Sequence, residues 1–241
     1  MEKLARVRLS PRLQMAADMV RAGVTAADIG TDHAYLPVYL IQNGICPGAI
    51  AADLKAKPLA NAYATVKAYG LAEKIALRLS DGLDKIEPGE AADIILAGMG
   101  GDLITGIIGR ASWLCDSSKQ LIIQPMTRAE TVREFLCRRG FKILHENACM
   151  EGGKCYLAIC ARYDGLSGKV FAPAYFHLGE LPLCREAAAI EFMSRLYRRL
   201  KIRADALTAS GSNPGETAQL KEILRKISEV LNEPFDSRQT L

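Results

Sequence analysis

The feature that most constrains the fold of this chain is a regular alternation between short apolar runs and helix-like segments. Each apolar run is five or six residues long, and the segment after it repeats apolar residues every three or four positions. The runs predict strands at residues 24–29, 49–53, 75–79, 92–97 and 120–124, and the segments predict helices at 10–22, 34–43, 58–69, 102–109 and 131–139. Because a helix between two strands forms a parallel crossover, this order predicts a doubly wound α/β sheet.

Two more apolar runs, residues 141–148 and 155–163, follow each other without a helix between them. The sequence Glu151-Gly152-Gly153 joins them, which is typical of an antiparallel hairpin. A parallel sheet that ends in such a hairpin has the architecture of a class I methyltransferase, whereas a dinucleotide-binding domain would continue with another crossover. We therefore predict a Rossmann-like class I methyltransferase domain over residues 1–163.

The remainder of the chain divides into a linker and a helical pair. Residues 164–184 contain three glycines and two prolines, which indicates a connecting segment. From residue 185 onward apolar residues return at helical spacing, and a single glycine- and proline-containing break at residues 211–215 interrupts them. Two amphipathic helices around a tight turn predict a coiled-coil-like α-helical hairpin over residues 185–241.

Acidic residues stand at the ends of the first three predicted strands, as Asp28, Asp53 and Asp81. The carboxyl ends of parallel strands meet at one edge of a sheet, so these acids are expected to surround one ligand. A carboxylate at Asp53 can accept both hydroxyls of a ribose, and one at Asp81 can accept the amino hydrogens of an adenine. Asp28 is expected to orient the glycine turn and an ammonium group. The structural alternative for each acid is a helix cap or a turn residue.

The turn after the first strand lacks the glycines of a phosphate-binding loop. Gly30 lets the backbone approach a ligand, but Asp32 and His33 stand where a dinucleotide-binding loop carries its later glycines. A carboxylate at Asp32 would repel a pyrophosphate. The turn therefore favours a ligand with a positive sulfonium and no phosphate. Asp32 and His33 are candidate contacts to this ligand or to the acceptor, and the alternative for His33 is a structural role.

The acceptor side is indicated by the sequence Gly-Met-Gly-Gly at residues 98–101, after the fourth strand. Many amino-methylating enzymes carry Asn or Asp, then Pro-Pro and an aromatic residue at this place, so the absence of that tetrad argues against an exocyclic amine as acceptor. A ring nitrogen such as adenine N1 has its own lone pair and needs alignment and a cavity for a flipped base. Backbone carbonyls near Gly98 and the amide of Gln124 are candidate partners for its edge.

The charge of the chain is modest overall but locally clustered. Its 241 residues carry a formal net charge of +4. Two stretches contain basic residues and no acid: Lys3, Arg6, Arg8 and Arg12 lie in the first, and Arg195, Arg198, Arg199, Lys201 and Arg203 lie in the second. Such clusters can contact the phosphates of a nucleic acid, and the alternative is a solvated helix face.

The seven cysteines are odd in number and show neither a CxxC pair nor a spacing typical of metal ligands. This pattern predicts neither a disulfide framework nor a metal site. The chain shows no apolar leader and no apolar run long enough to cross a membrane. We therefore expect a soluble, cytoplasmic protein, and no membrane or protein partner is implied.

Three motifs resemble those of a known family. DIGTDHAYLP at residues 28–37, AGMGG at residues 97–101 with Leu103-Ile104 after it, and Gln124-Pro125 are similar to the bacterial tRNA (adenine-N1) methyltransferases that modify position 22, the TrmK family. The resemblance runs from about Leu9 to the C-terminus. It implies an S-adenosylmethionine-binding domain, transfer of a methyl group to adenine N1 in tRNA, and a C-terminal extension that helps to hold the tRNA.

The residue patterns and the resemblance together give the candidate site residues. The expected contacts to the cofactor are Asp28, Gly30, Thr31, Asp32, His33, Asp53, Leu54, Asp81, Gly82, Gly98 and Met99. The candidate catalytic residues are Asp32, His33 and Gln124. The candidate tRNA contacts are Arg8, Arg12, Tyr35, Gly100, Arg195, Arg198, Arg199 and Arg203.

One residue departs from the family, whose members carry Asn after the Gln-Pro pair where this chain has Met126. We expect the acceptor pocket to differ at this residue, and the role of Gln124 to differ as well. Three alternatives stay open: a class I methyltransferase with a protein or small-metabolite acceptor, a non-catalytic RNA-binding protein, and a nicotinamide oxidoreductase. The basic clusters argue against a small metabolite, the retained acids against a non-catalytic protein, and Asp32 against the oxidoreductase.

Overall fold

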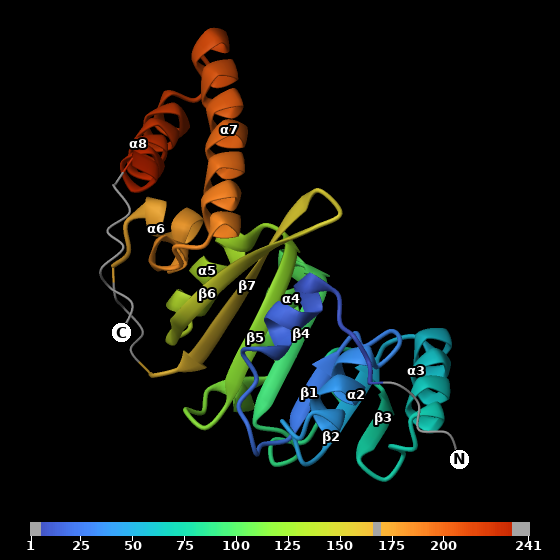
Figure 1. Ribbon diagram of the computed structural model, residues 1–241. Coiled ribbons are helices and arrows are strands. Elements are labelled where there is room, and N and C mark those ends of the chain that lie inside the picture. The colour runs from blue at the N-terminus through green and yellow to red at the C-terminus, as the bar shows by residue number, and fades with distance from the viewer. Residues whose placement is uncertain (1–5, 166–169, 233–241) are drawn as a thin grey trace.

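The computed structural model describes residues 6–165 and 170–232, in which seven strands form a single sheet (Figure 1). The strand order is β3-β2-β1-β4-β5-β7-β6. The strands are β1 (Ala26–Ile29), β2 (Ala49–Asp53), β3 (Ile75–Leu79), β4 (Asp93–Gly100), β5 (Gln120–Thr127), β6 (Phe141–Glu151) and β7 (Lys154–Tyr163). The first five strands pair in parallel and the last two antiparallel, which confirms the predicted Rossmann-like sheet with its terminal hairpin.

Helices cover both faces of this sheet, which explains why successive residues of its central strands β1, β2 and β4 are buried rather than every second one. On one face lie α1 (Pro11–Ala17), α2 (Tyr35–Gln42) and α3 (Ala56–Ala68), packed on a core that includes Ile95 and Ile122. On the other lie α4 (Gly101–Arg110) and α5 (Ala129–Arg138), packed on a core that includes Ile94 and Ile123. Successive residues of one strand thus enter different cores.

Several predicted boundaries were wrong at the edge where the candidate residues lie. Residues 98–100, predicted as a turn, continue strand β4, and β5 continues through Pro125 to Thr127. The two strands stay paired beyond Gly98 through a register shift, so that Met99 lies opposite Pro125. A β-bulge tolerates glycine and proline in a strand because the ladder hydrogen bonds are already interrupted there. Helices α3 and α5 each begin two residues earlier than predicted, and α1 ends at Ala17 rather than at residue 22.

The segment predicted as a connection, residues 164–184, contains regular structure, and its residues 166–169 lie outside the described residues. It contains helix α6 (Pro173–Leu178) and the 3-10 turn η2 (Leu181–Leu183). A buried ion pair holds both: Arg133 donates to the carbonyls of Phe176 and His177, and Glu146 accepts the backbone N–H groups of Glu180 and Leu181. These bonds come from α5 and β6, so the local sequence does not reveal them.

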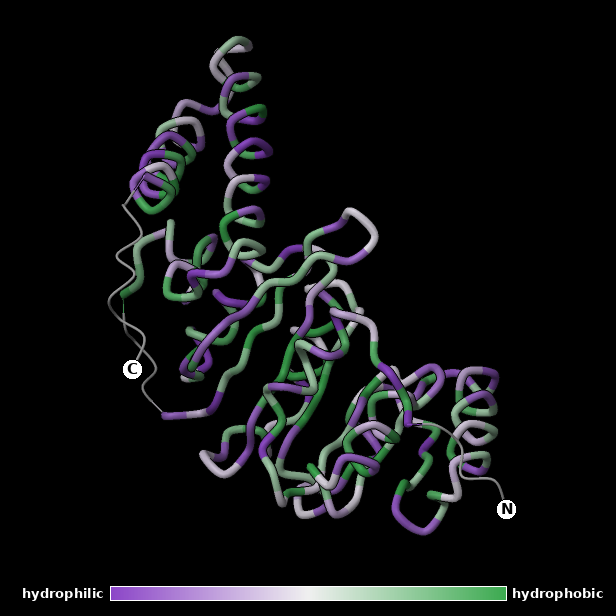
Figure 2. The backbone as a smooth tube through the Cα atoms, viewed as in Figure 1, coloured by the Kyte–Doolittle hydropathy of each residue, from purple (hydrophilic) through white to green (hydrophobic). Residues whose placement is uncertain are grey.

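The predicted helical hairpin is confirmed as α7 (Ala187–Ser210) and α8 (Pro214–Asn232), and residues 233–241 lie outside the described part. Helix α7 rises from the end of the sheet beside β6 and β7, and α8 returns along it (Figure 1). Hydrophilic and hydrophobic residues alternate along both helices (Figure 2). Their apolar residues, such as Met193 and Ile223, belong to the same core cluster as α4 and α5.

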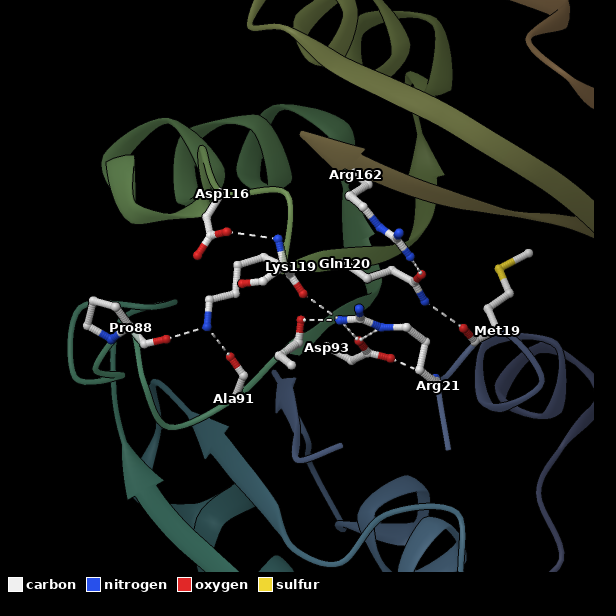
Figure 3. Close-up of polar contacts among 11 residues, drawn as sticks. Met19, Arg21, Pro88, Ala91, Asp93, Asp116, Lys119, Gln120 and Arg162 are labelled. Atoms are coloured by element: carbon white, nitrogen blue, oxygen red, sulfur yellow. Dashed lines mark hydrogen bonds and ion pairs between the residues drawn. The ribbon is translucent and has the colours of Figure 1, made fainter. Parts of the chain in front are cut away.

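A polar network fixes the sheet at the edge opposite the candidate site (Figure 3). The buried Asp93 carboxylate accepts hydrogen bonds from the backbone N–H and the guanidinium of Arg21, both at 2.7 Å. The side chain of Gln120 donates to the carbonyl of Met19 and accepts from Arg162. These contacts tie the first residues of β4 and β5 to the chain that follows α1.

All seven cysteines are free. In the part of the chain that the structure describes, no helix is long and apolar enough to cross a membrane. The same residues contain no cluster of three or more His, Cys, Asp or Glu side chains that could hold a metal ion.

Candidate active site

The turn after β1 forms the centre of the candidate site. The backbone N–H groups of Gly30 and Thr31 both donate to the carbonyl of Ala52, which draws the turn against the end of β2. Gly30 has a φ of +78°, and a Cβ atom there would lie 2.4 Å from Cε of Met99. Only glycine fits this conformation without strain, so the turn and Met99 meet at the strand ends.

The Asp28 carboxylate lies buried beneath this turn. It accepts a hydrogen bond of 2.6 Å from the hydroxyl of Thr31. Burial raises the pKa of Asp28 from 3.8 to about 6, although the bond from Thr31 lowers that pKa and the nearby Asp53 raises it slightly. A buried carboxylate that lacks a charged partner is suited to bind a cationic group of a ligand.

Asp32, His33 and Tyr35 line the outer side of the turn. Asp32 and Ala34 both adopt left-handed backbone conformations, with φ of 48° and 56°, which are uncommon for residues other than glycine. The His33 ring stacks on Tyr35 with centroids 5.4 Å apart, and its Nε2 lies 3.6 Å from the Asp32 carboxylate. The turn thus presents an exposed carboxylate and a pair of rings to solvent rather than a phosphate-binding loop.

Asp53 and Leu54 lie at the end of β2, beside this turn. One oxygen of Asp53 accepts the backbone N–H of Lys55 at 2.8 Å, and the other accepts no hydrogen bond from the described residues, so it is available to a ligand hydroxyl. Leu54 follows with 60% of its surface exposed, and Leu79 at the end of β3 is 55% exposed. Large apolar side chains so exposed at strand ends are suited to cover a flat apolar ligand.

Asp81 and Gly82 follow β3, and the structure gives them different tasks. The exposed Asp81 carboxylate accepts from Arg110 at 3.0 Å, so it shares its charge with helix α4. Gly82 is buried, and a Cβ there would lie 2.8 Å from the side chain of Ile107. Gly82 therefore serves close packing, and the candidate ligand contact at this place is Asp81.

Gly98 and Gln124 form the acceptor side. Gly98 leaves the strand ladder with a φ of +79°, and its N–H donates instead to Oε1 of the fully buried Gln124 at 3.0 Å. This bond fixes the amide so that its NH2 group lies 3.6 Å from the sulfur of Met126. Gln124 thus shapes the Gly98 bulge, and Gly100 continues the strand opposite Thr127.

Arg12 reaches this same edge from the start of α1. Its backbone N–H donates to Glu151 at 3.0 Å, and its guanidinium lies 3.6 Å from the same carboxylate. Nη1 of Arg12 also lies 3.5 Å from Oε1 of Gln124. A Cβ atom at Gly98 would lie 3.4 Å from the same Nη1 of Arg12. A cation beside the acceptor bulge is suited to hold a phosphate or to exclude a cationic group.

The strand ends therefore combine three acids, a glycine turn and two exposed leucines on one side with a polar bulge and a guanidinium on the other. The sequence matches the methyltransferase domain family over residues 9–159. It is 33% identical to the tRNA (adenine(22)-N(1))-methyltransferase of Bacillus subtilis (strain 168), over 95% of this chain and 98% of the relative.

The chain belongs to this tRNA methyltransferase family.

Solved structures agree with this assignment. The crystal structure of the B. subtilis m1A22 tRNA methyltransferase TrmK superposes with a TM-score of 0.80 and 30% identity, covering 94% of this chain and all of the other. Streptococcus pneumoniae Sp1610 in complex with S-adenosyl-L-methionine gives a TM-score of 0.79 and 30% identity, covering 93% of this chain and 100% of that one. The fold of the TrmK family thus extends over the C-terminal helices as well as the sheet.

The candidate tRNA contacts of this TrmK family member differ in how far they are already paired. Arg195 and Arg198 both contact Glu191 on the same helix, at 2.6 Å and 3.4 Å. Arg203 pairs with Glu216 of α8. These two acids lie outside residues 195–203, which is why the sequence window contained no acid. Arg8 and Arg199 are exposed and make no hydrogen bond or ion pair with the described residues.

Sequence reasoning missed two basic residues near the acceptor side. Arg128 begins α5 with a φ of 56° and pairs with Asp102 at 2.7 Å. Lys154 begins β7 and is exposed. Both residues stand alone in the sequence rather than in a basic cluster, so charge patterning did not indicate them. The one sequence signal was that Arg128 follows the candidate residue Gln124 by four positions.

Proposed function

We propose that this protein transfers a methyl group from S-adenosylmethionine to N1 of an adenine in tRNA, at position 22. The observation that carries the proposal is the identity over nearly the whole chain to a tRNA (adenine(22)-N(1))-methyltransferase. The geometry at the strand ends supports it, because the acids and the bulge lie at the carboxyl ends of neighbouring parallel strands. A tRNA substrate would place the reaction in the cytoplasm.

The residues present fit this cofactor. Asp28 offers a buried carboxylate to the ammonium group of its methionine part, beneath the turn in which Gly30 packs against Met99. The free oxygen of Asp53 suits a ribose hydroxyl, and Leu54 is exposed beside it. When bound, the cofactor supplies a methyl group on a positively charged sulfur. Asp81 offers one further carboxylate oxygen to an adenine amino group.

The chain's own contribution to the reaction is mainly alignment. Adenine N1 already has a lone pair at neutral pH, so the residues need to hold the base in line with the methyl group and to exclude water. The Gly98 bulge, held by Gln124, places backbone groups where the base would enter. Gln124 therefore acts as a positioning residue rather than as a proton acceptor.

Asp32 and His33 carry exposed polar side chains in the turn after β1. Methylation at N1 makes the adenine cationic, and the Asp32 carboxylate would stabilise that charge as it develops. The stacked pair of His33 and Tyr35 offers a flat surface for a base that has left its helix. These assignments rest on place and chemistry, and substitution tests them directly.

The experiment that tests the proposed function is nucleoside mass spectrometry of unmodified tRNA after incubation with enzyme and cofactor. We expect 1-methyladenosine, mapped to position 22, and no product from a transcript in which that adenine is replaced. Methylation of protein or of a small metabolite without tRNA methylation would favour another acceptor. Binding of S-adenosylhomocysteine and tRNA without any product would favour a non-catalytic protein.

A further inference from the structure

A cavity of about 440 Å³ lies between the end of the sheet and helix α7, on the α5 side of β5. Its walls come from the end of β5, the start of α5, the start of β7, helix α6 and one face of α7. Met126 lines it, two residues beyond Gln124, so the cavity begins where the acceptor side ends. Its size falls within the ~300–1,000 Å³ typical of small-ligand sites.

The charges around this cavity favour an anion. Arg128, Arg195 and Arg199 line it, and Glu130 is the one acid among its lining residues. A further lining residue, Arg133, is already neutralised by Glu146. Arg199 is exposed and without an ion pair among the described residues, so its guanidinium is available to a ligand. By contrast, a second cavity between α7 and α8 is lined by Lys201 and Asp205, which pair with each other.

An apolar wall faces these cations. Phe192 of α7 lines the cavity and is only partly buried against the core, beside the buried Leu196 and Leu157. Arg195 reaches from α7 to the β6–β7 turn and donates to the carbonyl of Gly153 at 2.8 Å, which ties the helix to the sheet at this place. Arg128 and Arg195 are paired with Asp102 and Glu191, which leaves Arg199 as the lining arginine without an ion pair among the described residues. An aromatic ring beside guanidinium groups is the combination that stacks a base and holds its phosphate.

Arg128 marks the border between the cavity and the acceptor side. Its left-handed backbone is unfavourable for a residue with a side chain, and such strain persists where the surroundings enforce it. Gly101 packs closely on this loop, because a Cβ there would lie 2.7 Å from the Arg128 carbonyl and 2.8 Å from that of Thr127. Helix α4 thus packs directly on this loop and fixes Arg128 between the two spaces.

We propose that this cavity binds one unstacked nucleotide of the substrate tRNA next to the target adenine, with its base on Phe192 and its phosphate on Arg199 and Arg128. The inference rests on the proposed function, because it names a second contact to the same substrate. It also gives a function to the junction between the methyltransferase sheet and α7, because the cavity needs residues from both parts.

The first test compares single-charge substitutions by direct titration of tRNA, without turnover. We expect Arg199→Gln to weaken tRNA binding about tenfold, with S-adenosylhomocysteine affinity unchanged. Arg198→Gln removes the same charge from the neighbouring residue, which does not line the cavity and is paired with Glu191, and its effect should be less than half as large on a logarithmic scale. Lys67→Gln, on the far helix α3, should have no effect. Equal losses at residues 198 and 199 would overturn the proposal.

The second test removes the stacking surface and retains the packing. We expect Phe192→Leu to weaken tRNA binding about fivefold and to leave thermal stability nearly unchanged, since leucine fills most of the same volume. Unchanged tRNA affinity in a folded Phe192→Leu protein would overturn the proposal. Wild-type protein that binds tRNA but forms no 1-methyladenosine would contradict the proposed function, and the two failures are therefore distinguishable.

The third test locates the nucleotide. Transcripts with a single 4-thiouridine on either side of position 22 should crosslink to peptides that contain residues 154–157 or 192–199. Crosslinks confined to other peptides would overturn the proposal. AMP serves as the free-nucleotide probe: tight AMP binding that Arg199→Gln abolishes, with tRNA affinity unchanged, would assign the cavity to a free nucleotide instead.

Discussion

The Asp28 carboxylate is buried, and among the described residues no cationic side chain pairs with it. Only the hydroxyl of Thr31 stabilises its ionised form, and burial raises the pKa of Asp28 to about 6. Such a group stabilises a bound ammonium at the expense of the unliganded fold. The same residue therefore controls cofactor affinity and pH-dependent stability.

We predict that Asp28→Asn stabilises the unliganded protein at neutral pH and weakens cofactor binding. The native pKa of about 6 exceeds the ordinary value of 3.8, so the stability that Asp28 confers is fully present below pH 4 and is lost as the pH rises through 6. Above that pH the lost contribution is on the order of 3 kcal/mol. Urea titrations at pH 4, 5 and 8 should show the variant gaining on the wild type as the pH rises.

Calorimetry with S-adenosylhomocysteine gives the matching control for Asp28→Asn. We expect its affinity to fall about tenfold or more at pH 8, because an amide cannot neutralise an ammonium group. Parallel stability curves for the two proteins across this pH range would contradict the assignment of a raised pKa.

Gln124 offers a second prediction at the scale of one residue. Gln124→Met keeps the shape of the side chain but leaves the Gly98 N–H without its acceptor, which costs about 1–2 kcal/mol of folding stability. We expect kcat to fall about tenfold, since the bulge would no longer be held, with tRNA affinity nearly unchanged. An unchanged kcat would mean that the bulge needs no support from Gln124.

At the scale of elements, the Arg133–Glu146 pair decides where the C-terminal helices sit. Both side chains are almost completely buried, and they bind one another at 2.8 Å. Their remaining hydrogen-bonding groups hold α6 and the turn before α7. Gly179 lies directly on them: a Cβ there would be 2.2 Å from the Glu146 carboxylate and 2.5 Å from Arg133 Nε. The pair thus joins α5 and β6 to the path that leads into α7.

We predict that Arg133→Met lowers the free energy of unfolding by about 3–5 kcal/mol, because it leaves the Glu146 charge buried without its partner. Arg138→Met, on the exposed side of the same helix, should change it by less than about 0.5 kcal/mol. Thermal and urea unfolding measure both. A similar small loss in the two variants would show that the buried pair does not hold this junction.

At the scale of the whole molecule, the candidate site and the cavity beside α7 lie at the same end of the sheet. The acceptor side and the cavity beside α7 both lie at the carboxyl end of β5, while the network around Asp93 lies at the first residues of β4 and β5, at the opposite end of the strands (Figure 3). With a net charge of only +4, the protein depends on the cations around this cavity for binding a polyanion.

We predict that tRNA affinity falls linearly with salt on a double logarithmic plot, since phosphate contacts release counterions. The affinity for S-adenosylhomocysteine should change little over the same range, because its contacts lie among buried or local groups. Fluorescence titrations between 50 and 300 mM potassium chloride, about the range in which such effects are measured, would show both slopes. Equal slopes for the two ligands would contradict this division.

The sequence by itself predicted a doubly wound parallel sheet, because alternation of apolar runs with helical periods leaves few topologies. It also placed Asp28, Asp53, Asp81 and Gly98 together, since parallel strands bring their carboxyl ends to one edge. The terminal hairpin and the two long helices followed from turn residues and helical spacing. These are local patterns whose physical consequences do not depend on distant parts of the chain.

Tertiary structure alone decided the rest. Strand pairing across the bulge extended β4 and β5 past their glycines and proline, and buried bonds from Arg133 and Glu146 ordered a segment whose composition indicated a linker. Glu216 of α8 paired with Arg203 of α7, whereas Arg199 has no ion pair among the described residues. The cavity beside α7 forms from four separate segments of the chain. Each of these features rests on contacts between residues far apart in the chain, and no local pattern records such contacts.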